Sequence, residues 1–155
     1  MNETKSLFNQ LQIIYFALFM GQVAIATIFY FLIQGETPNP DNLLQYVGIG
    51  ILLMNISVST VLYNMRKKQG RALKGGLSQR LKHFRVSSLI RWAMLEGGNL
   101  AILVFMFVDK RPFDLVFFAL GLGAFILTRP TTDMIAQDYE LSNDMERELR
   151  NATRS

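Results

Sequence analysis

The sequence predicts an all-α, polytopic membrane protein with four transmembrane helices. Half of its 155 residues are hydrophobic, and they gather into long blocks that are apolar on every side. A helix of a soluble domain keeps one polar face for water, so such blocks fit a bilayer better than a globule. Short stretches rich in glycine, proline and charge separate the blocks. The expected spans cover residues 11–33, 43–65, 86–108 and 113–129.

The first three spans are long enough to cross a bilayer without help. Residues 11–33, for example, form a helix of about 34 Å, against a hydrocarbon core of about 30 Å. Gly35 and Pro38 then end the helix, because neither residue type continues one readily. The fourth span is shorter. Its uninterrupted apolar block, residues 115–128, covers only about 21 Å and has to recruit flanking residues.

Three regions follow from this pattern. Residues 1–130 form the four-helix transmembrane domain, residues 66–85 a basic cytoplasmic loop within it, and residues 131–155 a cytoplasmic amphipathic tail. The tail sequence predicts a short helix that breaks near Leu141, with Asn143 capping its second part.

Lysine and arginine lie almost entirely on one side of the expected bundle. One precedes the first span, eight lie in residues 66–85 and four lie from Arg129 onward, so thirteen share the side of the amino terminus and two lie opposite. Cytoplasmic loops carry such an excess. We expect both termini in the cytoplasm and the chain in the cytoplasmic (inner) membrane of a bacterium.

Polar side chains near the centre of the spans are the candidate functional site. Gln22, Asn55, Glu96 and Asn99 lie close to the expected bilayer centre, where a charge costs about 2.5–3.5 kcal/mol. They should face one another, and Glu96 should bond to one of the amides. Arg91 is about 140° from Glu96 around the helix, so we expect no direct pair and a side chain that reaches the cytoplasmic interface. Interhelical bonding, a proton, cation or substrate site, and a subunit contact all fit.

The basic segment has three interpretations: a topology determinant, a site for anionic lipid headgroups, or a docking site for an acidic partner. Nucleic acid is not expected, because the segment lacks aromatic platforms apart from Phe84. Its candidate contact residues are Arg66, Lys67, Lys68, Arg71, Lys74, Arg80, Lys82 and Arg85.

Catalysis is not expected, and neither is a cofactor. The chain has no cysteine and one histidine, His83, so thiolate chemistry and a histidine-based metal site are excluded within one chain. It contains no glycine-rich phosphate loop and no serine with a usable base.

The sequence also suggests a tandem repeat of two helical hairpins. Gly21-Gln22 matches Gly98-Asn99 at an offset of 77 residues, and Tyr15 matches Trp92 at the same offset. Gly48 matches Gly121 at an offset of 73. The plainer interpretation is that these glycines let helix backbones approach closely.

Two families with a functional membrane glutamate resemble the chain in part. The proteolipid subunits of rotary ATPases are similar in length, paired hairpins and a mid-membrane carboxylate, here Glu96, but theirs lies in the second helix of a hairpin. Small multidrug transporters are similar in helix count, but their glutamate lies in the first span, where this chain has Gln22.

The chain resembles most a group of uncharacterised small four-span bacterial membrane proteins of the kind found in Bacteroidetes. The likeness covers nearly the whole chain and implies no function. Its motifs are Tyr15-Phe16-Ala17, Gly21-Gln22, Arg91 with Glu96-Gly97, Arg129-Pro130-Thr131 and Asp138-Tyr139-Glu140-Leu141.

Two functions therefore stand side by side. The first is a non-catalytic accessory or scaffold component that meets lipid and a membrane-protein partner. The second is a small transporter or proton-coupled conductor that uses Glu96, and with four spans it would need a homo-oligomer to enclose a path.

Overall fold

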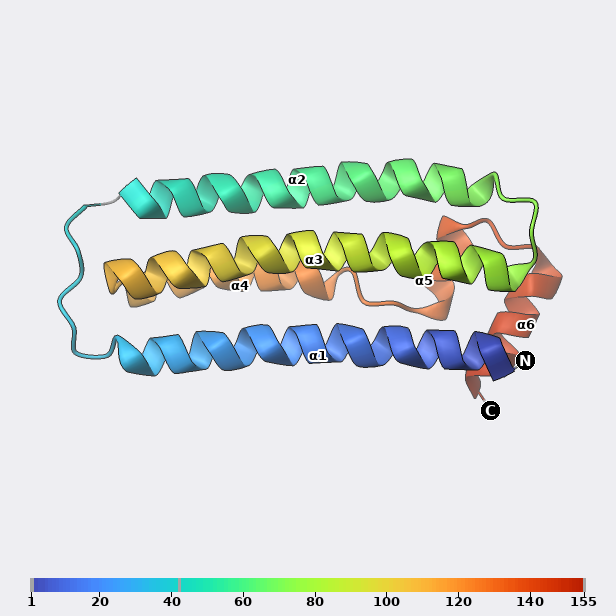
Figure 1. Ribbon diagram of the computed structural model, residues 1–155, viewed down its shortest axis with the longest axis horizontal. Coiled ribbons are helices and arrows are strands. Elements are labelled where there is room, and N and C mark those ends of the chain that lie inside the picture. Colours follow the sequence, from blue (N-terminus) through green and yellow to red (C-terminus); the bar gives the residue numbers. More distant parts are fainter. Residues whose placement is uncertain (1, 42, 155) are drawn as a thin grey trace.

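The computed structural model describes residues 2–41 and 43–154. Within this part every regular element is a helix, as the sequence predicts. Three long helices, α1 (Asn2–Leu32), α2 (Leu43–Arg71) and α3 (Leu77–Asp109), run along the molecule (Figure 1). The remaining elements are η1 (Pro112–Asp114), α4 (Leu115–Ile126), α5 (Thr132–Asp138) and α6 (Asn143–Arg154).

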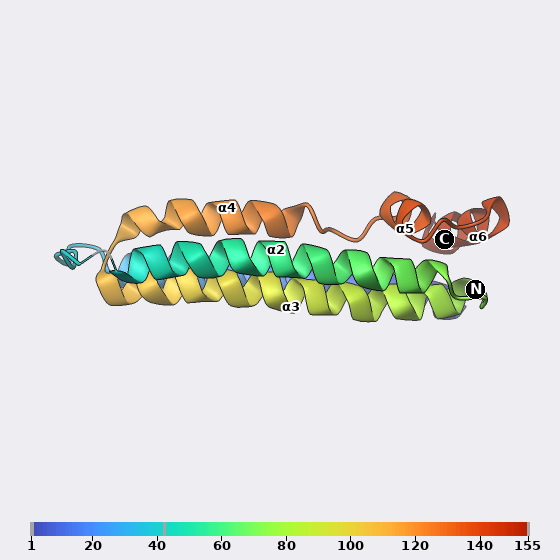
Figure 2. The same ribbon diagram turned by 90° about the horizontal axis from the view of Figure 1, so that it is seen from above.

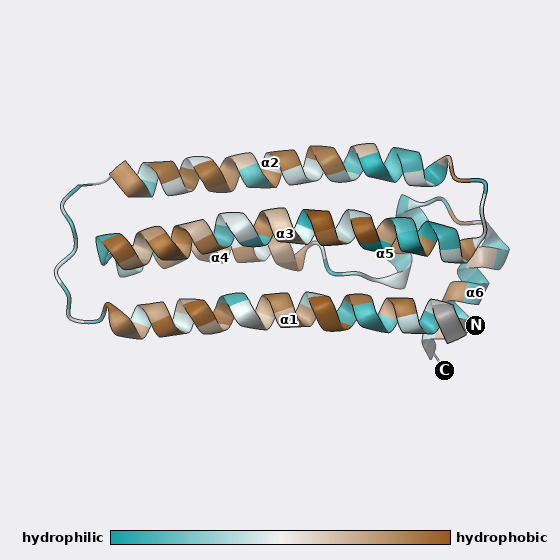
Figure 3. Cartoon of the chain, in the orientation of Figure 1, coloured by the Kyte–Doolittle hydropathy of each residue, from teal (hydrophilic) through white to brown (hydrophobic). Residues whose placement is uncertain are grey.

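Helices α1, α2 and α3 are each long and apolar enough to cross a membrane. A helix of 29 residues, the length of α2, measures about 44 Å. Apolar residues dominate the middle of each helix, and polar residues gather where α2 ends and α3 begins (Figure 3). Large apolar side chains such as Phe31, Leu53 and Val108 are exposed. An apolar surface of this kind is what a bilayer requires of the helices that it surrounds.

The predicted basic loop at residues 66–85 is mostly helical. Helix α2 continues to Arg71 and α3 begins at Leu77, so only residues 72–76 connect them. Hydropathy marks the point where a helix leaves lipid, whereas Lys, Arg and Gln are good helix formers that let it continue into water. Gly75 and Gly76 lie in the short connection, where a helix is interrupted most easily.

Helix α3 lies at the centre of the fold and packs against α1, α2 and α4. Helices α1 and α2 flank it in one layer (Figure 1), whereas α4, α5 and α6 lie on one side of that layer (Figure 2). Trp92, Leu103 and Met106 of α3 accordingly have no exposed surface. The residues of α3 therefore decide how the other helices are placed.

Helices α1 and α3 run in the same direction and pack in register (Figure 1). The Tyr15 and Trp92 rings contact each other with centroids 5.4 Å apart, and Gln22 bonds to Asn99. These are the matches that the sequence places 77 residues apart. The two hairpins are nevertheless unequal, because α4 has 12 residues where α2 has 29.

The fourth predicted span, residues 113–129, is not one long helix. Helix α4 covers about 18 Å and ends at Ile126, and residues 127–131 continue toward α5 without helical structure. Pro130 disfavours helical geometry at the residue before it. Carbonyl groups at this helix end are bonded to the bundle: the Trp92 indole donates to the Thr128 carbonyl at 3.3 Å, and the Tyr15 hydroxyl to the Ile126 carbonyl at 3.4 Å.

The two ends of the bundle differ in what they contain. The amino-terminal end of α1, the connection at 72–76 and the tail helices share one end (Figure 1). At the other end the two remaining links are bonded together: the Asn39 backbone amide donates to the Asp109 carbonyl at 2.9 Å. Lys110 and Glu36 form an ion pair there at 2.7 Å. The Glu36 carboxyl group has a pKa below its usual range, because the Lys110 ammonium group donates a hydrogen bond to it.

Candidate functional site

A buried amide pair joins α1 to α3 near the middle of both helices. Asn99 Nδ2 donates a hydrogen bond to Gln22 Oε1 at 2.7 Å, and neither side chain has exposed surface. Gln22 Nε2 also donates to the Leu18 carbonyl of its own helix at 3.4 Å. Where water is excluded, each amide is therefore the main partner of the other, and the pair fixes the two helices together.

Helix α4 meets this pair at Gly121. A methyl group at position 121 would overlap Asn99 Oδ1 and would lie 2.8 Å from Leu52 Cδ1 of α2. Because Gly121 has no side chain, the α4 backbone can approach the amide, and all four helices converge at this level. Asn99 Oδ1 is buried and accepts no hydrogen bond from the described residues, so close packing holds it.

Asn55 reaches the same level from α2, on another side of α3. Its Nδ2 group donates to the Ile51 carbonyl at 3.0 Å, and a methyl group at Gly98 would lie 3.1 Å from it. Gly98 and Asn99 are successive residues, about 100° apart around the helix. Of the three predicted amides, the fold thus joins Gln22 and Asn99 and leaves Asn55 bonded within α2.

The predicted hydrogen bond between Glu96 and an amide is wrong. The amides have other partners, and within the described residues the Glu96 carboxylate makes no hydrogen bond or ion pair. Residues three apart on a helix differ by about 60° in direction. Asn99 therefore points into the packed interior, whereas Glu96 stays only partly buried.

Arg91 lies away from Glu96, as its position on the helix predicts. Its guanidinium group sits 4.7 Å from the centre of the Tyr63 ring on α2, a cation–π distance. The Tyr63 hydroxyl in turn donates to Asp138 Oδ2 at 2.6 Å. Arg91 is thus connected to the tail rather than to the middle of the bundle.

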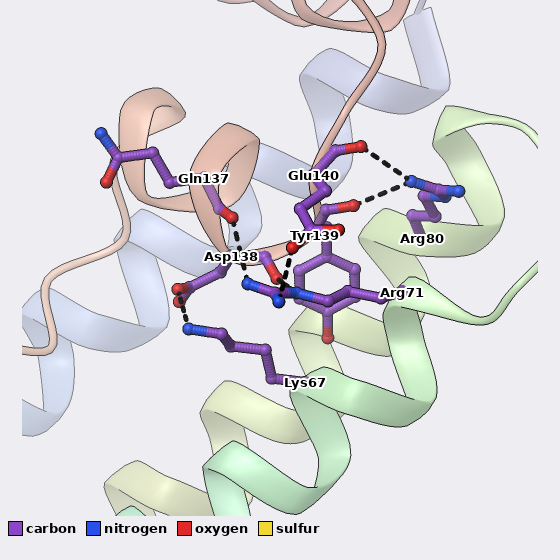
Figure 4. Close-up of polar contacts among 7 residues, drawn as sticks. All are labelled: Lys67, Arg71, Arg80, Gln137, Asp138, Tyr139 and Glu140. Carbon is purple, nitrogen blue, oxygen red and sulfur yellow. Dashed lines mark hydrogen bonds and ion pairs between the residues drawn. The ribbon is translucent and has the colours of Figure 1, made fainter.

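Three basic residues at the ends of α2 and α3 hold the segment between α5 and α6 (Figure 4). Lys67 Nζ lies 2.7 Å from Asp138 Oδ1. Arg71 pairs with the Glu140 carboxylate at 2.6 Å and donates to the Asp138 carbonyl at 2.8 Å. Arg80, from α3, donates to the Tyr139 carbonyl at 2.8 Å. We call these three cations the tail clamp.

Tyr139 anchors the same segment with its ring. It has no exposed surface and lies between α2 at Gly70 and α3 at Phe84, whose ring centroid is 5.8 Å away. The Tyr139 hydroxyl lies 2.8 Å from His83 Nδ1. Burial raises the pKa of the Tyr139 phenol above its ordinary value, so the hydroxyl keeps its proton at neutral pH and can donate it to a neutral imidazole.

The eight basic residues predicted to contact lipid or a partner therefore make different contacts. The tail clamp accounts for three of them. Arg66 donates from Nε to Ser87 Oγ at 3.0 Å, which joins α2 to α3. Exposed or partly exposed at the same end are Lys68, Lys74, Lys82 and Arg85.

Sequence reasoning missed the acidic side of this contact. The sequence places Asp138 and Glu140 on a solvated face, because the acids of the tail alternate with Arg147 and Arg150. One signal could have found it: a segment with eight cations and no acid and a tail with six acids are expected at the same end of the bundle. Opposite charges in such proximity predict an internal contact.

The tail forms two capped helices. Thr131 caps α5, accepting a hydrogen bond from the Met134 amide at 3.1 Å. The predicted break near Leu141 is present, but Ser142 rather than Asn143 holds the capping position of α6, accepting a bond from the Met145 amide at 3.5 Å. Leu149, on the inner side of α6, has no exposed surface, and α6 packs on α1.

The fold is thus a helical bundle that contains three helices of membrane-spanning length, a buried amide pair and a tail fixed to one end. No protein-family model, curated protein or solved structure matches the chain.

Proposed function

We propose that the protein is a non-catalytic accessory or scaffold component of a bacterial cytoplasmic membrane, with four crossings and both termini in the cytoplasm. The charge distribution supports this orientation, since thirteen of the sixteen lysine and arginine residues belong to the amino terminus, to residues 66–85 and to the chain from Arg129 onward. In the fourth crossing, α4 covers the outer part of the bilayer and residues 126–131 complete the passage, with bonds from α1 to the Ile126 carbonyl and from α3 to the Thr128 carbonyl.

The observation that carries this function is the attachment of the tail. Helices α5 and α6 are fixed to the bundle by the tail clamp and the buried Tyr139 ring, so their outer face has a defined orientation relative to the membrane. Glu148 and Arg147 are exposed on that face. A rigid, charged platform at the membrane surface suits recognition of a cytoplasmic partner.

The amide pair supports a structural role for the membrane part. Gln22 and Asn99 bond to each other without exposed surface, which is the arrangement of interhelical bonding and not of a water-filled path. We therefore assign the bundle the role of holding the platform at the membrane.

Cross-linking in native membranes tests the platform. A photo-reactive amino acid at Glu148 should capture one cytoplasmic or membrane partner, identified by mass spectrometry after purification. The same label at Thr37, exposed at the opposite end, is the control. Capture of the same protein from both positions, or of none from Glu148, would contradict a platform function.

Single cysteines test the topology, because the native chain has none. Cysteine at Thr37 should react with an impermeant maleimide in intact cells, whereas cysteine at Gln69 or at Glu148 should react only after the membrane is opened. Reaction of position 148 from outside would show that the chain does not recross after α3.

A second function has one observation in its favour. Glu96 is an acid in the middle of α3 that is partly exposed and has no bonding partner among the described residues. A conductor built on it would show proton flux in liposomes that Glu96→Gln abolishes while the fold stays intact. From the scaffold function we expect background flux from both proteins, so a Glu96-dependent flux would overturn it.

A further inference from the structure

We propose that the tail clamp is a binding site for the anionic headgroup of a membrane phospholipid, and that the tail occupies this site in competition with the lipid. Asp138 and Glu140 would then act as an internal substitute for the headgroup. The inference goes beyond the scaffold function and adds a control to it: the platform keeps its fixed orientation only while the tail occupies the tail clamp.

The position of the cations fits the headgroup layer. Lys67 lies two residues beyond the expected end of the second span, about 3 Å outside the hydrocarbon, and Arg71 lies about 9 Å outside it. Arg80 lies at a similar height on α3, six residues before the expected third span. Headgroups occupy a layer of roughly 5–8 Å on each side of the hydrocarbon. All three cations therefore lie within or beside it.

The donors of the tail clamp also fit phosphate. Two guanidinium groups and one ammonium group converge from α2 and α3 on two carboxylates and on backbone carbonyl oxygens of the tail. Arginine forks bind phosphate oxygens in the same geometry as carboxylate oxygens, and lysine adds a point charge. An anionic phosphodiester thus presents the acceptors that the tail now supplies.

The outer part of the tail contact, at Glu140, is built so that it can be exchanged, whereas the Asp138 side chain is only 16% exposed in its pair with Lys67. The Glu140 side chain is 66% exposed in its pair with Arg71, and exposed ion pairs are weak. Glu140 also has a φ of 46°, in the left-handed region that costs energy for any residue except glycine. Release would relax this turn, whereas the buried Tyr139 ring opposes release. The balance should therefore respond to the amount of anionic lipid.

A distance measurement in nanodiscs tests the competition. Spin labels on cysteines at Gln69 and Asn143, both exposed, report the separation of α2 and the tail. In phosphatidylcholine we expect one short separation. Increasing phosphatidylglycerol should add a second, longer separation that becomes the major population.

Matched variants distinguish a site from a general charge effect. Asp138→Asn with Glu140→Gln should open the tail at a several-fold lower fraction of phosphatidylglycerol, because the competing carboxylates are gone. Lys68→Gln with Lys74→Gln removes two exposed cations of the same segment and should leave the response unchanged.

Three results would overturn the proposal. The first is a separation that does not change at any fraction of phosphatidylglycerol. The second is loss of the response in the Lys68 and Lys74 variant, which would show diffuse attraction. The third is opening by inorganic phosphate in phosphatidylcholine discs, which would identify a soluble ligand instead of a lipid.

Discussion

Replacing Gly70 with alanine is expected to detach the tail from the bundle. The new methyl group would overlap the Tyr139 ring and would lie 2.9 Å from His83 Nδ1. Overfilling a packed site costs about 1–3 kcal/mol, and here the ring can leave instead of adjusting. We expect a lower free energy of unfolding in detergent and rapid proteolysis between α5 and α6.

The control for this change lies in the same helix. Gly50 also belongs to α2, and a methyl group there meets nothing within 4 Å. Gly50→Ala should leave the tail protected. In a Tyr139→Ala background, which itself should cost about 3–5 kcal/mol, Gly70→Ala should have no further effect on the tail. An equal cost in both backgrounds would show that Gly70 acts through α2 alone.

Gly121→Ala is expected to separate α4 from α3 and to weaken the amide pair. Its methyl group would overlap Asn99 Oδ1 and would press on Leu52. The expected loss is about 1–3 kcal/mol from overfilling. Displacement of Asn99 from Gln22 should add about 0.6 kcal/mol, the average for hydrogen bonds between membrane helices, and at most about 1.7 kcal/mol. The free energy of unfolding, measured in mixed micelles, reports the sum of these two losses.

Gly123→Ala is the matched substitution for this prediction. Gly123 lies one half-turn further along α4, and a methyl group there meets nothing within 4 Å. It should be neutral or slightly stabilising, because alanine favours a helix more than glycine does. A similar loss of unfolding free energy from both substitutions would mean that α4 tolerates no alanine. The contact between Gly121 and Asn99 would then not explain the effect.

Hydropathy and spacing predict the membrane part well for simple physical reasons. The three long helices follow from blocks that lack a polar face, and the meeting of Gln22 with Asn99 follows from the cost of a lone amide in lipid. The wrong partner for Glu96 shows the limit. Spacing along one helix gives direction to within about 60°, which does not decide whether a side chain enters the core or its edge.

The end of the bundle that holds the tail is predicted less well, because it depends on contacts between distant segments. The extension of α2 to Arg71 is invisible to hydropathy, which reports only where lipid ends. Pairing of Lys67 with Asp138 joins residues 71 positions apart, and no local pattern encodes it. Pro130 indicates that a helix should end shortly before it. The prediction of a span over residues 113–129 instead followed the length of the apolar block.

The stretch that follows α4 sets an order for biogenesis. The backbone amides of residues 127–129 bond to carbonyl groups of α4. The carbonyl groups at this helix end instead accept bonds from other helices, Ile126 from Tyr15 on α1 and Thr128 from Trp92 on α3, which a bilayer requires because it offers no water. The first three helices can each enter the membrane as independent units when they leave the translocon. In the proposed topology the last segment lacks this independence, so we expect it to reach its place only after α1 and α3 have associated. A chain stalled before that step would then expose its final third to quality-control proteases.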